Sequence, residues 1–297
     1  MTKSASSAIL ADIGATNARF ALLVDGDISA STTYAVADYD SPIDAARAFL
    51  AGPATGHTPD RALIAAAGPV VNGRVNMTNA AWTVDTKRIR QRLGLENVQV
   101  LNDFEALGWA LLALRSEDLF ALGDGTPLER GTMAVMGPGT GFGLAAIAFG
   151  AGSETLLVTE GGHATLSSEN RREDAVILAL RAQVHHVSVE RVLSGPGLVQ
   201  LYHAIAMVDG LTVPERTSAD IVKHALAGDC PASRQALDMF CAFLGSVAGN
   251  VALTLGARGG LFIGGGVTPH FTDFLQRSAF RERFESKGPM SGYLARI

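Results

Sequence analysis

The sequence predicts an α/β protein in which two layers of strands and helices follow one another along the chain. Short stretches rich in β-branched and apolar residues alternate with segments of helical spacing. A turn of small residues around a threonine lies between two strands at residues 12–17 and again at residues 137–143. With 297 residues, of which 47% are hydrophobic and 18% charged, the chain is long enough for two domains or one large one and can bury a substantial core. We place the boundary between a smaller domain, 1–112, and a larger one, 113–297.

Residues 8–24 are typical of a strand, a tight turn and a second strand. Gly14 permits a positive φ, and the backbone amides of residues 14–17 could cradle a phosphate. Asp12 enters this turn from the strand, where it could hold a magnesium ion directly or through water. A plain hairpin with polar turn residues explains the same pattern equally well.

The next segments complete most of the first domain. A helix over residues 41–50 opens with a Ser-Pro pair, and an apolar strand covers residues 62–67. An Asn-Gly pair at residues 72–73 predicts a hairpin turn. A second helix begins after Asp85 and ends at Gly94.

The strand over residues 98–101 runs directly into Asn102 and Asp103, and a helical pattern follows to about Leu114. In α/β proteins the point where a strand passes into a helix is where ligands bind. Asn and Asp are also common helix caps, and taken alone these two residues favour a cap. The glycine turns on either side of this stretch shift the interpretation towards a ligand site.

The second domain begins with the same pattern of strand, glycine turn and strand, over residues 133–148. Gly141, Gly143 and Ala146 loosely match a dinucleotide-binding fingerprint, but a strand follows where that motif requires a helix. The sequence also lacks the GxxxxGK[ST] loop, which excludes the common P-loop NTPases. The two halves therefore share an architecture without a recognisable sequence repeat.

A strand over residues 155–158 leads into Glu160-Gly161-Gly162-His163. A lone histidine is more often structural than functional, but a Glu-Gly-Gly-His sequence at a strand end favours a role in binding. The helices expected after it are a pair at 172–185 and 198–208, one that starts with a capping box at Thr217, and a buried one that ends near Gly256. A strand at 259–263, three glycines and a last helix after Pro269 follow.

Composition argues against several classes of partner. A net charge of −5 and the lack of a basic run disfavour nucleic acid and an acidic membrane surface. Cys230 and Cys241 form no CxxC or Cys/His spacing, so we expect neither a disulfide framework nor zinc, and a reducing cytoplasm fits. We expect no signal peptide, because Asp12 interrupts the first apolar run. Residues 239–257 are uncharged, and we interpret them as the central helix of a soluble domain.

The motifs together resemble the bacterial glucokinases of the zinc-free type, within the actin-like ATPase and hexokinase superfamily. The resemblance covers nearly all of the chain, and the string over residues 187–198, VSVERVLSGPGL, is specific to these enzymes. The other segments that carry it are DIGATN at 12–17, LNDF at 101–104, GPGTG at 137–141, EGGH at 160–163 and GGG at 264–266.

The resemblance implies two actin-like (ribonuclease H-like) domains, each with a five-stranded mixed sheet and flanking helices, and a ligand cleft between them. It implies ATP-dependent phosphorylation of glucose at the 6-hydroxyl, with Asp103 as the base and Asp12 holding Mg²⁺ through water. The sugar-binding residues that it implies are Asn79, Asn102, Asp103, Glu160, His163 and Glu190. The nucleotide-binding residues are Asp12, Ile13, Gly14, Ala15, Thr16, Asn17, Gly139, Thr140, Gly141, Gly264, Gly265 and Gly266.

Two departures from the family pattern stand out. Ala15 replaces a usual second glycine, and the chain stops at Ile297, where the family begins a final strand and a C-terminal helix. We therefore expect this form to be less stable and less active than a longer one. The resemblance further implies a cytoplasmic homodimer that uses ATP and glucose, without zinc, nucleic acid or membrane partners.

The alternative is a sugar-binding regulatory module of the same fold without kinase turnover. Repressors of this kind carry a helix-turn-helix before the first strand and usually a cysteine-rich zinc loop. We expect no helix-turn-helix here, because the first strand starts near Ala8. The two cysteines, Cys230 and Cys241, do not form a cysteine-rich zinc loop.

Overall fold

The computed structural model describes residues 7–77, 82–150 and 152–297. The chain forms two compact units, Met1–Ala106 and Leu107–Ile297. The division lies inside helix α3 (Asp103–Ala110), which ends before the expected Leu114. Gly108 in its last turn lowers the helix propensity there.

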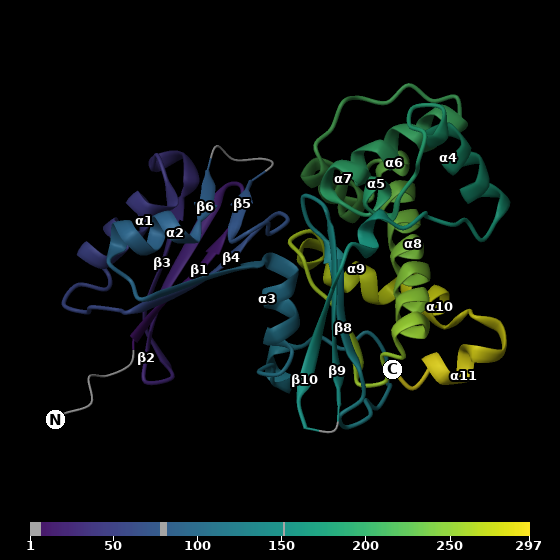
Figure 1. The fold of residues 1–297 in the computed structure, drawn as a ribbon. Coiled ribbons are helices and arrows are strands. Elements are labelled where there is room, and N and C mark those ends of the chain that lie inside the picture. The colour runs from purple at the N-terminus through teal and green to yellow at the C-terminus, as the bar shows by residue number, and fades with distance from the viewer. Residues whose placement is uncertain (1–6, 78–81, 151) are drawn as a thin grey trace. The chain divides into compact units, whose positions relative to one another are not determined.

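The first unit contains a five-stranded mixed sheet in the order β3-β2-β1-β4-β7 (Figure 1). β1 (Ser7–Ile13), β2 (Asn17–Val24) and β3 (Asp27–Ala35) are antiparallel neighbours. β4 (Arg61–Ala66) and β7 (Asn97–Asn102) run parallel to β1. The sheet of the first domain is thus five-stranded and mixed, as the resemblance implied.

The helices of this unit begin and end where local signals place them. Ser41 caps α1 (Pro42–Ala51) by accepting a hydrogen bond from the Asp44 amide. Asp85 caps α2 (Thr86–Leu93) in the same way, and Gly94 ends it in the left-handed conformation. The remaining elements are η1 (Val36–Asp38) and the hairpin of β5 (Arg74–Asn76) and β6 (Thr83–Asp85).

Alternation along the strands gives the sheet two different faces. Ile9 and Ile13 belong to the hydrophobic core that Phe49 of α1 and Ile89 of α2 complete. Side chains of the opposite face, including Leu10, Asp12, Leu63 and Leu101, line a hollow of about 410 Å³. Asp12 therefore lies on the face opposite the core.

The second unit contains a four-stranded mixed sheet in the order β10-β9-β8-β11 (Figure 1). β8 (Met133–Pro138), β9 (Phe142–Phe149) and β10 (Glu154–Thr159) form antiparallel pairs, and β11 (Gly260–Ile263) is parallel to β8. The prediction of a five-stranded sheet in this unit is wrong, because the described residues form four strands here. The chain after β11 forms short helices and supplies no further strand to this sheet.

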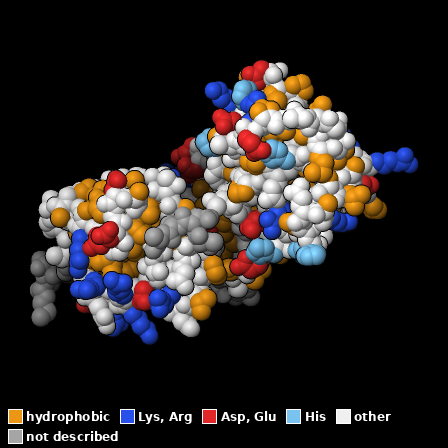
Figure 2. All heavy atoms as spheres, turned by 90° about the horizontal axis from the view of Figure 1, so that it is seen from above, with side chains coloured by type: hydrophobic (Ala, Val, Ile, Leu, Met, Phe, Trp, Pro, Cys, Tyr) orange, Lys and Arg blue, Asp and Glu red, His pale blue; other side chains and the backbone are white. Residues whose placement is uncertain are grey.

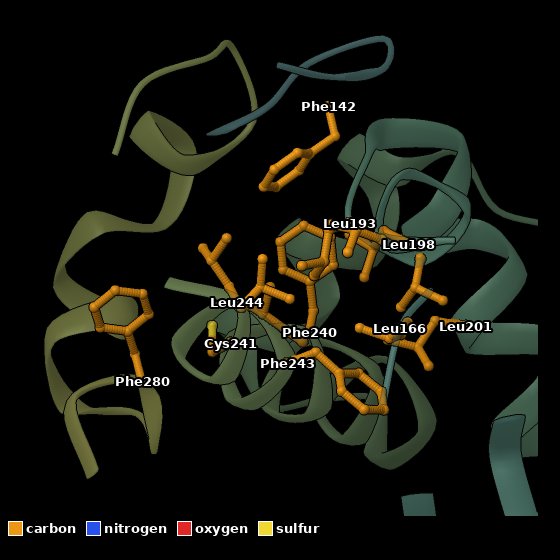
Figure 3. Close-up of a cluster of buried hydrophobic side chains, with 14 of the residues drawn as sticks. Phe142, Leu166, Leu193, Leu198, Leu201, Phe240, Cys241, Phe243, Leu244 and Phe280 are labelled. Carbon is orange, nitrogen blue, oxygen red and sulfur yellow. The ribbon is translucent and has the colours of Figure 1, made fainter. Parts of the chain in front are cut away.

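Helices pack against this sheet around one central helix, α8 (Pro231–Leu255), which begins at a Cys-Pro pair. Figure 3 shows Phe240, Cys241 and Leu244 of α8 in one cluster with Leu193 and Leu198. In the described part of the chain α8 is the one helix long and apolar enough to span a membrane, and 72% of its most apolar window is buried. The other helices of this unit are α4 (Arg171–Arg181), α5 (Val189–Val192), α6 (Gly195–Val208), α7 (Ser218–Ala227), α9 (Thr272–Arg277), α10 (Phe280–Glu285) and α11 (Ser291–Leu294), with η2 (Ser116–Asp118), η3 (Gly161–His163), η4 (Thr268–Phe271) and η5 (Gly288–Met290).

Charged side chains of both signs are interspersed on the face of the molecule that Figure 2 shows. On the face drawn in Figure 2, Lys and Arg groups lie next to Asp and Glu groups, with hydrophobic and neutral side chains between them. Arg61 and Asp60, for example, form an exposed ion pair at 2.9 Å. Such pairs contribute little stability, about 0–1 kcal/mol each.

Candidate active site

The parallel strands of the first unit end together at one edge of its sheet. Ile13, Ala66 and Asn102 are aligned in register across β1, β4 and β7. The turn after β1 and the start of α3 therefore lie at the same edge, which is where ligands bind in open α/β sheets. Asp12 and Asp103, which are far apart in sequence, thus lie at the same edge, with β4 between the two strands that lead to them.

The turn after β1 is a tight connection to β2. The Gly14 amide donates a 2.9 Å hydrogen bond to the Asn17 carbonyl, and the Val36 amide donates to the Thr16 carbonyl. Ile13 is buried, Gly14 and Ala15 are half-buried, and Thr16 and Asn17 are exposed. The turn thus presents its tip to solvent while β1, β2 and β3 hold its base.

Asn102 does cap the following helix, as the simpler interpretation of this stretch held. Its side-chain oxygen accepts a 2.9 Å hydrogen bond from the Phe104 amide. Its side-chain nitrogen donates at 3.1 Å to the carbonyl of Gly68, the glycine that follows β4. The Asn102 backbone amide in turn donates to the Glu105 carboxylate at 3.3 Å. These three bonds fix the end of β7 against α3 and against the neighbouring loop.

Asp103 is the first residue of α3 and is half-buried. Burial raises the pKa of its carboxyl, and the charge of Asp12 adds to this effect. The Phe104 amide, which donates to Oδ1 at 3.0 Å, works in the opposite direction and only partly offsets the rise. The result is a carboxylate that holds a proton more strongly than an ordinary Asp, which suits a general base.

In the second unit, the segment Gly137–Gly141 covers the end of β8 and the turn into β9. Because this segment is expected to bind phosphate, we call it the phosphate turn. The Gly139 amide donates to the Gly141 carbonyl at 2.8 Å, which closes the turn. The Gly195 amide at the start of α6 donates to the Gly139 carbonyl at 2.9 Å. Thr140 is exposed at the tip. The turn is thus held from behind by α6 and open at its tip.

The glycines at 264–266 pack backbone to backbone against the phosphate turn. The Gly264 amide donates to the Met136 carbonyl at 2.8 Å, and the Val267 amide donates to the Pro138 carbonyl at 3.1 Å. A Cβ added at Gly137 would overlap the Gly264 carbonyl, and one added at Gly265, where φ is +85°, would overlap the Pro138 carbonyl. Glycine is therefore required for this approach. The two segments expected to bind nucleotide lie side by side.

The residues expected to bind sugar in this unit also lie close together. η3 places Glu160 and His163 just after β10, with 3.9 Å between Oε2 of Glu160 and Nε2 of His163. Both side chains are exposed. The Val189 amide donates to the Ala164 carbonyl at 2.9 Å, which fastens the segment after η3 to the start of α5, the helix that carries Glu190.

Two residues, Asn79 and Arg19, differ from the predicted site residues described above. Asn79 lies outside the described residues. Arg19 was missed in the sequence, although its Nη1 pairs with Oδ2 of Asp12 at 2.8 Å. The two residues are direct cross-strand partners in β1 and β2, a relationship that the hairpin register would have given.

The magnesium ion that the resemblance implies would find one carboxylate donor at this edge, that of Asp12. Asp12 is one exposed carboxylate, and Arg19 engages one of its oxygens. Mg²⁺ keeps several waters and is held by one or two carboxylates together with substrate phosphates. Among residues 7–77, 82–150 and 152–297 no group of three or more His, Cys, Asp or Glu side chains is placed to hold a metal.

A sequence model of the glucokinase family, described as "Glucokinase", matches residues 9–297. The chain is 43% identical over 291 residues to a glucokinase of Paramagnetospirillum magneticum, covering 97% of this chain and 91% of that protein. It is 41% identical over 295 residues to a glucokinase of Caulobacter vibrioides, with 97% and 88% coverage.

Solved structures agree with these matches. A glucokinase from an Antarctic psychrotroph superposes with a TM-score of 0.88 at 38% identity, covering 99% of this chain and 93% of that one. A glucokinase of the ROK family from Streptomyces griseus, solved with glucose and AMPPNP, gives a TM-score of 0.59 at 21% identity, with 95% and 89% coverage. The second likeness shows a shared α/β fold only.

Proposed function

The chain belongs to the glucokinase family, and we propose that it transfers the γ-phosphoryl group of ATP to the 6-hydroxyl of glucose, giving glucose 6-phosphate and ADP. The observation that carries this proposal is the position of Asp103. It is a carboxylate of raised pKa at the carboxyl edge of the first sheet, directly after Asn102, which is aligned through Ala66 with Ile13 at the end of β1. Phosphoryl transfer needs one such base and, beyond it, mostly positioning and charge stabilisation.

In the proposed reaction Asp103 accepts the proton of the 6-hydroxyl as that oxygen attacks the γ-phosphorus. A base is most effective when its pKa approaches the working pH while it stays ionised, and burial moves Asp103 in that direction. The hydrogen bonds of Asn102 to Gly68 and Phe104 keep the start of α3 in place. Asn102 would thus position the base and use its remaining hydrogen-bonding capacity on neighbouring sugar hydroxyls.

The other sugar hydroxyls are assigned to polar side chains that the fold holds on short, well-anchored segments. Each hydroxyl paired with a fixed donor or acceptor penalises an epimer that leaves the partner unpaired. The exposed pair of Glu160 and His163 beside α5 supports this assignment. The proposed set is Asn79, Asn102, Glu160, His163 and Glu190.

The nucleotide is assigned to the glycine turns of the two units. Backbone amides in such turns bind phosphate oxygens, and Mg²⁺ bound with the ATP would be held by Asp12 through water. The close packing of residues 264–266 on the phosphate turn supports a shared surface for the phosphates and the adenosine. The residues proposed are Asp12, Ile13, Gly14, Ala15, Thr16, Asn17, Gly139, Thr140, Gly141, Gly264, Gly265 and Gly266.

We further expect a zinc-free cytoplasmic homodimer without nucleic acid or membrane partners. Its two cysteines are free thiols, and its net charge is −5. The alternative, a sugar-binding regulator without turnover, is not favoured because the relatives at 41–43% identity are named as kinases.

A coupled assay of ADP release with Mg·ATP tests the proposal across glucose, mannose, galactose and fructose. We expect rapid release with glucose and much slower release with galactose. His163→Ala should raise KM for glucose, and a zinc chelator that spares magnesium should have no effect. ADP release that does not depend on any hexose, or tightly bound zinc in the pure protein, would contradict this assignment.

A further inference from the structure

Glu190 extends from its helix to the phosphate turn. It is the second residue of α5, a short helix that Ser188 caps by accepting a 3.2 Å hydrogen bond from the Arg191 amide. Oε2 of Glu190 accepts a 2.8 Å hydrogen bond from the amide of Phe142, the first residue of β9. A Cβ added at the preceding residue, Gly141, would overlap the same oxygen. The carboxylate therefore lies directly against the end of the turn.

This bond differs in kind from the other attachments of the turn. Those from Gly195, Gly264 and Val267 join backbone to backbone. In the part of the chain that the structure describes, Glu190 makes the one side-chain hydrogen bond to the segment 137–142. A bond to an ionised acceptor is roughly twice as strong as a neutral one, so we expect its loss to loosen the turn.

We propose that Glu190 is a positioning residue for the nucleotide as well as a ligand of the sugar. Its Oε2 fixes the Phe142 amide and with it the conformation of the phosphate turn, and a sugar hydroxyl would meet the other oxygen, Oε1. Both halves rest on the proposed function: the sugar half on the assignment of glucose, and the nucleotide half only on the assignment of nucleotide phosphates to this turn. One carboxylate would then serve both substrates, so that binding of either one favours the other.

Three variants separate the two roles. Glu190→Gln keeps an oxygen that can accept from the Phe142 amide but removes the charge. Glu190→Asp keeps the charge but shortens the side chain by one methylene, so that it no longer reaches the amide. Glu190→Ala removes both. His163→Ala is the matched control, because it changes the proposed sugar set without touching the phosphate turn.

The measurement is the affinity for ADP and for Mg·AMPPNP, by calorimetry without any sugar, on variants whose melting temperature and circular dichroism match the parent. We expect Glu190→Ala and Glu190→Asp to weaken nucleotide binding about tenfold, the scale of one lost hydrogen bond to a charged group. Glu190→Gln, which keeps a neutral acceptor for the Phe142 amide, should lose less nucleotide affinity than either of these two variants. His163→Ala should leave nucleotide affinity unchanged while raising KM for glucose.

Parent-like nucleotide affinity in both Glu190→Asp and Glu190→Ala would overturn the inference. So would an equal loss in Glu190→Gln, because the retained acceptor should rescue the turn. If the parent protein failed to phosphorylate glucose but Glu190→Ala still weakened ADP binding, the proposed function would fall and this inference would stand. If Glu190→Ala melts below the assay temperature, the comparison of Glu190→Asp with Glu190→Gln decides alone.

Discussion

Asp103 and Asp12 are coupled through their charges at one edge of the first sheet. Burial raises the pKa of the Asp103 carboxyl, and the negative charge of Asp12 raises it further. The proposed base is the ionised form, which is lost as the pH falls through this raised pKa. The rate should therefore fall on the acid side at a higher pH than an ordinary aspartate would give.

Replacing Asp12 tests two effects separately: that of its charge on the pKa of Asp103, and its proposed part in holding magnesium. Asp12→Asn removes the negative charge near Asp103, so the acid limb of kcat/KM against pH should move to lower pH. The height of the profile should also fall, since Asp12 is proposed to hold the magnesium of Mg·ATP. The pH dependence of kcat/KM is measured at saturating magnesium. If the midpoint of the acid limb stays in place or moves to higher pH in Asp12→Asn, the charge of Asp12 does not raise the pKa of Asp103.

The close approach at Gly137 predicts a sharp difference between two glycines of the phosphate turn. Gly137→Ala would drive a methyl group into the Gly264 carbonyl and should cost about 1–3 kcal/mol of unfolding free energy. Gly139→Ala is the matched control, because an added Cβ there meets nothing within 4 Å. Thermal melting should separate the two variants. Gly139→Ala should weaken nucleotide binding at unchanged stability if phosphates contact this turn.

A buried ion pair joins α10 to α4 in the second unit. Arg283 donates to both carboxylate oxygens of Glu173, at 2.6 and 3.0 Å, and Glu173 is only 3% exposed. Arg283→Met leaves that buried carboxylate without its cation, with only the Glu169 amide and the Asn170 side chain donating to it. The variant should lose about 3–5 kcal/mol in denaturant unfolding. Arg115→Ala, which removes an exposed pair with Glu117, should cost about 0–1 kcal/mol. Similar losses in the two variants would contradict this account.

The two cysteines should differ in their reaction with iodoacetamide. Burial raises the pKa of Cys241 to about 12, so its thiolate is scarce and inaccessible. Burial also acts on Cys230, but the Ser233 hydroxyl and amide and the Arg216 charge bring its pKa below the usual value. Mass spectrometry of the native protein between pH 7 and 9 should show carbamidomethylation at Cys230 well before Cys241. The order should vanish in denaturant.

Local signals were enough to predict most element positions. The Ser-Pro start of α1, the Asp85 cap and Gly94 end of α2, and the Thr217 capping box of α7 appear where the sequence placed them. Each depends on hydrogen bonds within four residues along the chain, so the sequence contains all the partners. The end of α3 was predicted too late, because Gly108 weakens a helix whose apolar pattern continues past it.

Longer-range relationships could not be predicted in this way. The bond from the Phe142 amide to Glu190 joins residues 48 positions apart, and that from Asn102 to Gly68 joins residues 34 apart. Both depend on how strands and loops assemble, which periodicity does not report. The glycine-rich segments 137–141 and 264–266 of the second unit were predicted from the sequence. That they pack against each other through Gly137 and Gly265 became apparent only in the structure.

The stability of the Asp103→Asn variant can serve as a control for folding when its activity is used to test whether Asp103 is the base. Because the pKa is raised in the folded state, the ionised carboxylate disfavours the fold above that pKa, and this penalty disappears as the pH falls through it. Asp103→Asn removes the penalty at neutral pH. The variant should therefore melt at the same temperature as the parent or higher, so that lost activity cannot be ascribed to unfolding.

The most direct test is the turnover of Asp103→Asn with glucose and Mg·ATP, together with its affinity for glucose. If Asp103 is the base of a glucose 6-phosphotransferase, kcat should fall about 100-fold or more while glucose still binds within a few-fold of the parent. Turnover close to that of the parent in this well-folded variant would remove Asp103 from the mechanism and contradict the account.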